Sequence, residues 1–470
     1  MNSKFENKQT IYNLLSQFLL NATNFILIMV FTRYLSTDNY GVAAIYQAYA
    51  LLFSVIIGIS THGTIGTAFI RLNKEVRKNI YLSNIFLLSF LSFIVVFLFA
   101  YLFRNILSDF SKLPSFLIIL IVISGYGTFC FNFLNFNYVY KREAQKSFIL
   151  SLVLAVMMIF FSYLGIKNIS SLSFPYLSRI IGLSTPYVIC GVGVSFLLFS
   201  KLSKLDSIDN LKKDWLFCLP ICVPLVFHNI AQIILGQTDK IMLQKMLEDY
   251  SIVGIYTFIV TFTHITNSIY IALNNTWIPI YYNSIKNNDV NTLKLRSKNY
   301  IYLFTSIICG FIMLSPEVIK LVAKKEYWDG IIIIPIATIS VYMVFLYSFA
   351  INFELYNKKS KAIAIGTMLT ALINVILNYF LIPIYGIYGA VIATFFSYFF
   401  LFVFHYISAK KITDSIFPFR ILFFVPSFLI VLFFSIVFYV TIEYFFLRFI
   451  ISLLFGAYIF FNFRKNKTLF

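Results

Sequence analysis

Charged residues are scarce in this sequence. Asp, Glu, Lys and Arg together make up 12% of the 470 residues, whereas they make up about 25% of a soluble globular protein. Hydrophobic residues reach 60%, and 19% of the chain is Phe, Tyr or Trp. A soluble enzyme of this length could not bury so much apolar surface. The composition therefore predicts an integral membrane protein.

Acidic residues are the scarcer charged group, with 18 Asp and Glu against 37 Lys and Arg. None of the carboxylates lies in the middle of a long apolar run. Proton and sodium relays through membranes usually use an Asp or Glu at that depth, so an antiporter built on such carboxylates is disfavoured. The excess positive charge falls between apolar runs, which is typical of cytoplasmic loops and not of a nucleic-acid-binding protein.

Motifs for cofactors, metals and nucleophilic catalysis are also missing. The sequence has no P-loop, no zinc-binding HExxH, no GxSxG nucleophile motif and no GxGxxG placed after a strand. The five cysteines lie within apolar runs, and Cys218 and Cys222 have no His at metal-ligand spacing, so we interpret them as packing residues. We predict no metal, no cofactor, no nucleic-acid partner and no enzymatic activity.

Fourteen apolar runs are long enough to span a membrane, since a helical span needs about 20 mostly apolar residues. No segment between them exceeds about 17 residues, which leaves no room for a folded domain outside the membrane. The first run lacks a cleavage site and is predicted to be a retained helix. The runs are 11–32, 42–69, 80–103, 114–139, 147–166, 174–200, 215–238, 251–281, 300–319, 331–352, 362–382, 386–408, 421–441 and 449–463.

The distribution of Lys and Arg predicts the orientation. The connecting segments on one side of the membrane hold 26 of these residues, and those on the other side hold 10. Cytoplasmic loops carry the excess, so both termini are predicted to lie in the cytoplasm. The alternation also favours an even number of spans, because a miscounted span would scramble it.

A weak internal repeat divides the chain. Tyr140-Lys-Arg-Glu-Ala-Gln joins the fourth and fifth runs, and Tyr356-Asn-Lys-Lys-Ser-Lys joins the tenth and eleventh. Repeats that enclose a midplane cavity recur in transporters. We predict an all-α polytopic protein with two six-helix bundles around a central cavity, at 1–205 and 206–410, and two additional transmembrane helices at 411–470.

Polar residues at helical spacing predict the walls of this cavity, because polar side chains are costly in lipid unless they face the bundle interior or water. Hydrogen bonding between helices is the alternative explanation. The cavity candidates are Asn13, Gln17, Asn21 and Asn24 in the first run, His228 and Gln232 in the seventh, His264 in the eighth, and Asn374 and Asn378 in the eleventh. A neutral, hydrogen-bonding cavity suits a sugar better than a bare ion.

Arg179 is the rarest feature, because it lies inside the sixth run with no acidic residue nearby in sequence. Its side chain either extends to the outer membrane surface or faces the cavity. In the cavity it could bind a phosphate or an acidic sugar by charge-assisted hydrogen bonds. Arg33, Asp239 and Lys240 lie at the outer ends of runs, where a structural and a functional role are equally open.

Three stretches resemble the polysaccharide (O-antigen and capsule) repeat-unit flippases of the MATE-like (MOP) superfamily. The first is Thr32-Arg33-Tyr34-Leu35 with Tyr40-Gly41. The second comprises Leu219-Pro220, Thr238-Asp239-Lys240, Val253-Gly254-Ile255-Tyr256 and Trp277-Ile278-Pro279. The third and most specific runs from Ala371-Leu-Ile-Asn374-Val-Ile-Leu-Asn378 through Ile382-Pro383-Ile-Tyr-Gly386-Ile-Tyr-Gly389-Ala390 to Thr394.

The resemblance implies two six-helix bundles around a V-shaped cavity. It also implies transport of an undecaprenyl-pyrophosphate-linked oligosaccharide to the periplasmic leaflet, by alternating access, for O-antigen, lipopolysaccharide, capsule or exopolysaccharide biosynthesis. The expected partners are this lipid-linked substrate, membrane lipid, and the glycan polymerase and chain-length regulator of the pathway. Two alternatives stay open, a MATE-type drug/cation antiporter and a polytopic glycan polymerase or ligase.

Overall fold

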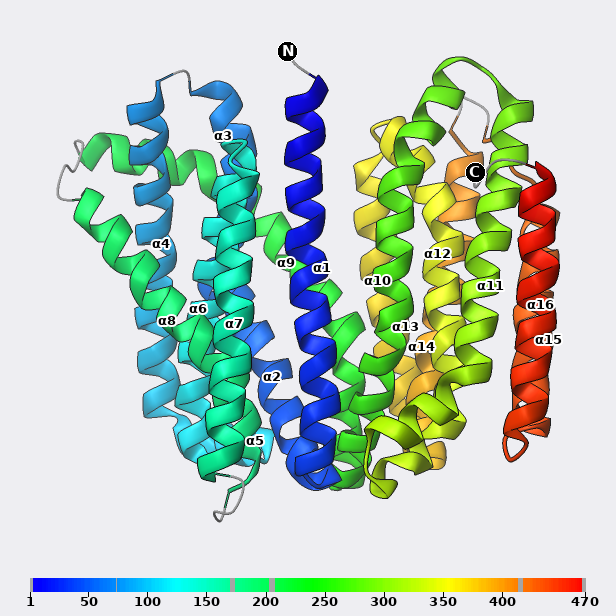
Figure 1. Cartoon of the computed structure of the whole chain (residues 1–470). Helices are drawn as coiled ribbons and strands as arrows, with labels where there is room; N and C mark the ends of the chain where they lie inside the picture. Colours follow the sequence, from blue (N-terminus) through cyan, green and yellow to red (C-terminus); the bar gives the residue numbers. More distant parts are fainter. Residues whose placement is uncertain (1–2, 73, 170–173, 203–207, 413–416, 467–470) are drawn as a thin grey trace. The chain divides into compact units, whose positions relative to one another are not determined.

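The computed structural model describes residues 3–72, 74–169, 174–202, 208–412 and 417–466, and its long elements are α-helices (Figure 1). Twelve helices in this described part are long and apolar enough to cross a membrane. They are α1 (Ser3–Tyr34), α2 (Thr37–Gly58), α4 (Glu75–Leu102), α6 (Ser115–Tyr140), α7 (Ala144–Ile169), α8 (Tyr176–Leu202), α9 (Ile208–Leu247), α10 (Tyr250–Lys286), α11 (Val290–Val322), α12 (Ile334–Tyr356), α13 (Ser360–Tyr385) and α14 (Ile387–Lys410).

Shorter elements complete the chain. The helices α15 (Val425–Val440) and α16 (Phe445–Asn466) are apolar and correspond to the last two predicted runs. Two further short helices, α3 (Ile65–Arg71) and α5 (Arg104–Ser111), and three 3-10 helices lie between the long ones; the 3-10 helices are η1 (Thr61–Thr64), η2 (Lys325–Ile333) and η3 (Ile421–Phe423). The predicted fold class, an all-α polytopic membrane protein, is confirmed.

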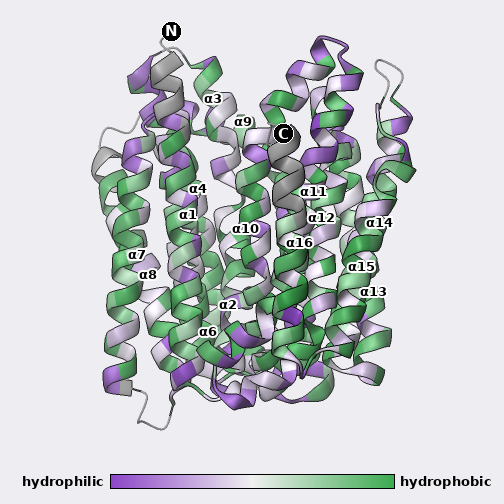
Figure 2. Cartoon of the chain, turned by 45° about the vertical axis from the view of Figure 1, so that its right-hand side comes forward, coloured by the Kyte–Doolittle hydropathy of each residue, from purple (hydrophilic) through white to green (hydrophobic). Residues whose placement is uncertain are grey.

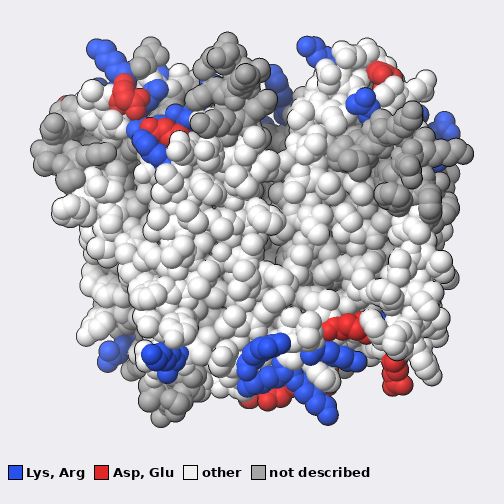
Figure 3. Space-filling model, viewed as in Figure 1, with Lys and Arg blue, Asp and Glu red and all other residues white. Residues whose placement is uncertain are grey.

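The distribution of polarity along the helices is that of membrane spans. Hydrophobic residues occupy the middle of the helices in each part of the chain, and hydrophilic residues gather toward their ends (Figure 2). The charged side chains visible on the face in Figure 3 lie near helix ends, with uncharged surface between them. Water-facing ends and an apolar middle are what a bilayer requires.

One predicted run, 42–69, is wrong as a single helix. The helix α2 ends at Gly58, and Ile59 and Ser60 follow with φ of 47° and 52°. Positive φ is rare for a β-branched residue, so surrounding contacts must hold this break. Thr61 and Ser89 share a hydroxyl–hydroxyl hydrogen bond of 2.8 Å, and the Ser89 hydroxyl donates to the Gly58 carbonyl at 3.1 Å. The stretch Ser60-Thr61-His62-Gly63-Thr64 is polar or small, so the sequence carries a local signal for this break that the prediction of one run passed over.

Contacts between helices divide the chain into two compact units, Met1–Gly254 and Ile255–Phe470. In the first unit, α2 packs on α6, α8 packs on α6 and α7, and α1 packs on α7. The helix α9 packs on α2 and α4 in the same unit. In the second unit, α14 packs on α12 and α13, and α11 packs on α15 and α16. The functional division into bundles at 1–205 and 206–410 stays a prediction.

The two loops of the internal repeat have the same backbone geometry. Arg142 and its counterpart Lys358 both have φ of 57°. Around Arg142, the N–H groups of residues 141, 142 and 143 donate to the carbonyls of residues 137, 139 and 138. The N–H groups of residues 357, 358 and 359 donate to those of residues 353, 355 and 354 in the same pattern. The two similar sequences therefore form the same helix-ending turn, which also occurs at Asn288 with φ of 53°.

The orientation can be tested with reporter fusions. Since miscounting one span inverts every later loop, we expect alternating results along the chain. Fusions after Asp109, Lys167, Lys245, Lys325 and Glu443 should report the periplasm, and fusions after Lys78, Lys146, Lys213, Lys298, Lys361 and Lys411 should report the cytoplasm. Reversed signals at two consecutive loops would contradict the arrangement of fourteen spans with both ends cytoplasmic.

Candidate substrate-recognition site

Arg179 lies in the first turn of α8 and is 5% exposed. Its Nη1 donates a hydrogen bond to the Tyr40 carbonyl at 3.4 Å. The guanidinium carbon lies 3.5 Å from the centroid of the Tyr40 ring, so a cation–π contact accompanies the hydrogen bond. A side chain of α2 holds the first residue of α8 in place, because the Asn39 side-chain oxygen accepts a hydrogen bond from the Tyr176 N–H at 3.2 Å. Arg179 is therefore buried inside the first unit and does not extend to its surface.

A second cation lies close to this buried charge. The ammonium of Lys240, on α9, interacts electrostatically with Arg179 and with Asp239. It also donates a hydrogen bond to the Gln237 side-chain oxygen at 2.8 Å. Asp239 is 5% exposed. We call Arg179, Tyr40, Asp239 and Lys240 the Arg179 cluster; its two cations and one carboxylate give a net charge of +1, which can attract an anion.

The space directly beside Arg179 is small. A cavity of about 70 Å³ is lined by residues of α2, α6 and α8, among them Gln47, Thr128, Arg179 and Ser184. Since one water takes roughly 30 Å³ of liquid volume, this cavity can hold about two waters. A sugar phosphate does not fit in it. The cavity can hydrate Arg179.

Next to the cluster, the backbones at the start of α2 and the start of α10 approach each other closely. The hydroxyls of Thr37 and Ser251 are 2.6 Å apart. A Cβ at Gly41 would collide with the Tyr250 carbonyl, and a Cβ at Gly254 would collide with the Thr37 carbonyl. We call Thr37, Gly41, Ser251 and Gly254 the α2–α10 junction. Small residues at both helices permit this backbone approach.

The polar stripe of α1 lies on an accessible side of that helix. Gln17 and Asn21 are exposed, and Asn13 and Asn24 are half-buried. The buried residues Ser16, Thr23 and Leu27 lie on another side, and exposed apolar residues on a third. With 3.6 residues per turn, the polar stripe is roughly 140° around the helix from the exposed apolar residues. This separation favours one face toward water and one toward lipid. The exposed apolar residues are Ile11, Leu15, Phe18 and Ile26.

A family model described as polysaccharide biosynthesis protein matches residues 7–283. The chain belongs to this family. That confirms the resemblance to repeat-unit flippases found in the sequence. The match includes α1 with its polar stripe, the Arg179 cluster and the α2–α10 junction. Among proteins of curated function, no sequence matches this family member significantly.

Solved structures show the same fold at low sequence identity. The lipid II flippase MurJ in an inward closed conformation has a TM-score of 0.71 and 16% identity, and the match covers 97% of this chain and 100% of that one. The MATE multidrug transporter DinF-BH, solved in a ligand complex, has a TM-score of 0.59 and 14% identity, with 89% and 98% covered. This family member therefore has the same fold as these two solved transport proteins.

The other first-unit candidates lie apart from the Arg179 cluster along their helices. On α9, His228 is half-buried and Gln232 is exposed, while their neighbour Asn229 donates a hydrogen bond to the Ser60 hydroxyl at 3.0 Å. Arg33 is exposed near the end of α1. The prediction that the α1 stripe faces His228 and Gln232 across one cavity stays a prediction.

The second-unit candidates differ sharply in accessibility. His264 is exposed on α10. Asn374 and Asn378 are fully buried on α13, and the Asn378 amide donates to the Asn374 side-chain oxygen at 3.0 Å. Their burial favours helix packing over substrate contact, which is the alternative that the sequence left open for them.

Three polar pairs with buried members, two ion pairs and one carboxylate–histidine hydrogen bond, were not found from the sequence. Asp214 accepts hydrogen bonds from Arg77 at 2.9 Å and from Asn84 at 2.7 Å. Glu354 lies 2.7 Å from the His405 Nδ1, and both side chains are fully buried. The third pair is Arg448 with Glu317. All three join residues far apart in the chain, and no local sequence pattern marks them.

The accessibility of the α1 stripe can be tested by cysteine labelling. In a background without the five native cysteines, Gln17→Cys and Asn21→Cys should react with a membrane-impermeant maleimide, because their face contacts water. Leu15→Cys and Phe18→Cys should react at least about tenfold more slowly, since lipid excludes the charged reagent. Equal labelling of the two pairs would show that the stripe does not line an aqueous space.

Proposed function

We propose that this protein moves a lipid-linked oligosaccharide from the cytoplasmic to the outer leaflet of the membrane. The observation that carries the proposal is its membership of the polysaccharide biosynthesis protein family over residues 7–283. The fold supports it, because a solved protein with that fold is a flippase for lipid II, itself a lipid-linked molecule by its name.

The chemistry of the described residues suits the two polar parts of such a substrate. The Arg179 cluster has a net positive charge for the pyrophosphate or for an acidic sugar. The amide side chains of the α1 stripe can donate and accept hydrogen bonds with neutral sugar hydroxyls. The required step is alternating access, in which one end of the cavity closes while the other opens. The tightly packed α2–α10 junction is suited to form the closed state at one end.

We further propose the bacterial inner membrane as the location, with both termini cytoplasmic, and an O-antigen, lipopolysaccharide, capsule or exopolysaccharide pathway as the context. In such a pathway the glycan polymerase and the chain-length regulator would act on the delivered unit. The charge asymmetry of the connecting segments supports the orientation.

Deletion of the gene tests the proposed function. A lipid-linked oligosaccharide should accumulate in the deleted strain on the cytoplasmic leaflet, where it stays inaccessible to enzymes added outside intact spheroplasts. Expression of the wild-type chain should restore access. If no lipid-linked glycan accumulates and the strain instead becomes sensitive to cationic drugs, a MATE-type antiporter would be the better account.

A further inference from the structure

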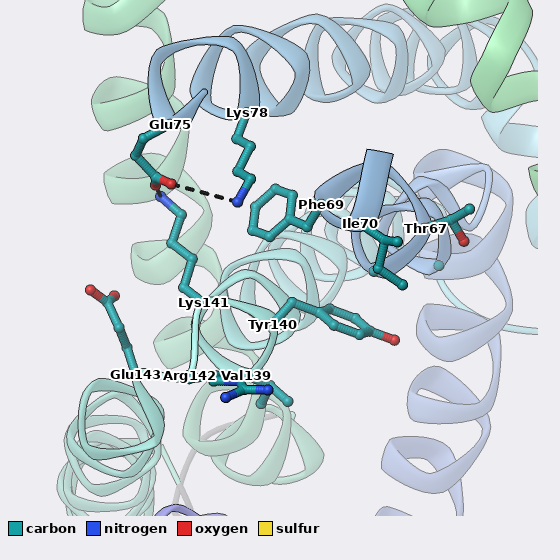
Figure 4. A pocket seen from close by; sticks show the side chains of 12 residues that line it. Thr67, Phe69, Ile70, Glu75, Lys78, Val139, Tyr140, Lys141, Arg142 and Glu143 are labelled. Atoms are coloured by element: carbon teal, nitrogen blue, oxygen red, sulfur yellow. Dashed lines mark ion pairs between the residues drawn. The ribbon is translucent and has the colours of Figure 1, made fainter. Parts of the chain in front are cut away.

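A second polar cavity lies in the first unit, away from the Arg179 cluster. It is formed by α3, by the start of α4 and by the loop between α6 and α7. Its volume is about 830 Å³, within the range of pockets that bind small molecules. Figure 4 shows Lys78 and Lys141 reaching toward Glu75 at one side of it, with Phe69, Ile70 and Tyr140 at another.

The cations of this cavity are held in place. The Lys141 ammonium donates to the Asn79 side-chain oxygen at 2.9 Å and lies 3.2 Å from a Glu75 oxygen. The Lys78 ammonium lies 3.9 Å from the other Glu75 oxygen. Both lysine side chains are about four-fifths buried, at 22% and 20% exposure. Two ammonium groups fixed around one carboxylate form a preorganised site with donors left for an anion.

The rest of the wall adds a further cation. Arg142 and Glu143 both line the cavity, and Glu143 pairs with Lys146 at 2.8 Å. The lining residues Lys78, Lys141 and Arg142 therefore exceed Glu75 and Glu143 by one positive charge. Arg142 is held in the left-handed region, with φ of 57°, a conformation that costs free energy for a residue other than glycine. The turn presents Arg142 at the cavity despite that cost.

The cavity also has an apolar wall whose side chains are exposed at the protein surface. Ile70 is 85% exposed, and Tyr140 is also exposed. The Tyr140 ring lies against Gly66, where a Cβ would collide with it. The wall is close to the ends of apolar helices α4 and α6. A ligand that fits these surfaces has an anionic group attached to hydrocarbon.

We infer that this cavity binds the phosphate headgroup of an anionic membrane phospholipid, with its acyl chains along Ile70 and Tyr140. Lys78, Lys141 and Arg142 would bind the phosphate oxygens. A free phosphate shares the anionic chemistry but makes no use of the apolar wall. This site is separate from the Arg179 cluster, and the inference does not depend on which molecule the protein transports.

The test measures binding of dihexanoyl phosphatidylglycerol to the delipidated full-length protein by native mass spectrometry. The zwitterionic dihexanoyl phosphatidylcholine and inorganic phosphate are the comparison ligands. Phosphatidylglycerol should bind at least about tenfold more tightly than either, because it alone supplies both net negative charge and hydrocarbon. Replacement of both lysines, in Lys78→Ala/Lys141→Ala, should weaken its binding by about tenfold or more.

Two further variants separate charge from folding. Glu143→Gln removes a negative charge from the wall and should strengthen binding, a result that misfolding cannot produce. The matched control is Lys358→Ala in the repeat-related loop, where the turn has the same geometry as at Arg142; its binding should stay at the wild-type level, whereas Arg142→Ala should reduce it. Equal loss in both loop variants, unchanged binding in the double variant, or inorganic phosphate binding as tightly as the lipid would each overturn the inference.

Discussion

Gly41→Val should abolish transport. The Cβ alone would collide with the Tyr250 carbonyl, and the valine methyl groups add further volume at a point where neither helix has a side chain that can move away. Overpacking costs about 1–3 kcal/mol; because this collision is with a backbone carbonyl, we expect the upper end of that range, a factor of roughly 150 in the population of the packed state. We expect the α2–α10 junction to open and alternation to stop, as measured by complementation of a deletion strain.

Matched glycines provide the control for this result. Gly254→Val should have the same effect, because a Cβ there meets the Thr37 carbonyl. A Cβ at Gly236, on α9 in the same unit, meets no atom within 4 Å, so Gly236→Val should retain transport. Protein yield and gel-filtration profile should be comparable in all three variants. Full complementation by Gly41→Val at native expression would show that the junction need not close.

Arg179→Ala should cause the second large loss. It removes the cation of the Arg179 cluster that is both buried and stacked on Tyr40, and a hydrogen bond to a charged group contributes about 1.5–3 kcal/mol. We expect transport rates to fall by roughly 10- to 150-fold. Arg179→Lys keeps the charge but loses the planar fork that binds two oxygens at once, so it should retain partial activity.

The control for Arg179 is Arg104→Ala. Arg104 is an exposed cation in the same unit, and its loss should leave transport unchanged. If Arg179→Ala transports at the wild-type rate, the residue only holds α8 against α2, and the cation site has to be sought elsewhere.

The positions of the helices could be predicted because hydropathy is a local property. Each of the fourteen apolar runs except 42–69 corresponds to one long helix or to one of the two C-terminal helices, since the length that a bilayer requires is a property of consecutive residues. The break at Ile59 and Ser60 has a local signal in the polar stretch that follows Ile59, but the contact from Ser89 on another helix that holds it is not visible in the sequence. The repeat-related turns could be identified from six residues, since a helix-ending turn is also a local structure.

The candidate site was only partly predictable for the same reason. Arg179 could be singled out because one charge in an apolar run is conspicuous, but its partner Tyr40 is 139 positions away in the sequence. The α2–α10 junction depends on two glycines whose importance appears only when the helices are packed. Glu354 and His405 are near helix ends, where sequence reasoning expects water, yet both are fully buried. These features depend on contacts between residues that are far apart in the sequence, so a short stretch of sequence cannot reveal them.

The most direct test of the central claim is translocation by the purified protein in liposomes. The probe is the undecaprenyl-pyrophosphate-linked oligosaccharide isolated from the deletion strain, incorporated in both leaflets and oxidised from outside at its sugars with periodate. Without protein about half of it should be protected, because only the outer leaflet is accessible. With the wild-type chain the protected fraction should fall toward zero, and with Gly41→Val it should stay near half. Protection that is unchanged by the wild-type protein would contradict the assignment as a lipid-linked oligosaccharide flippase.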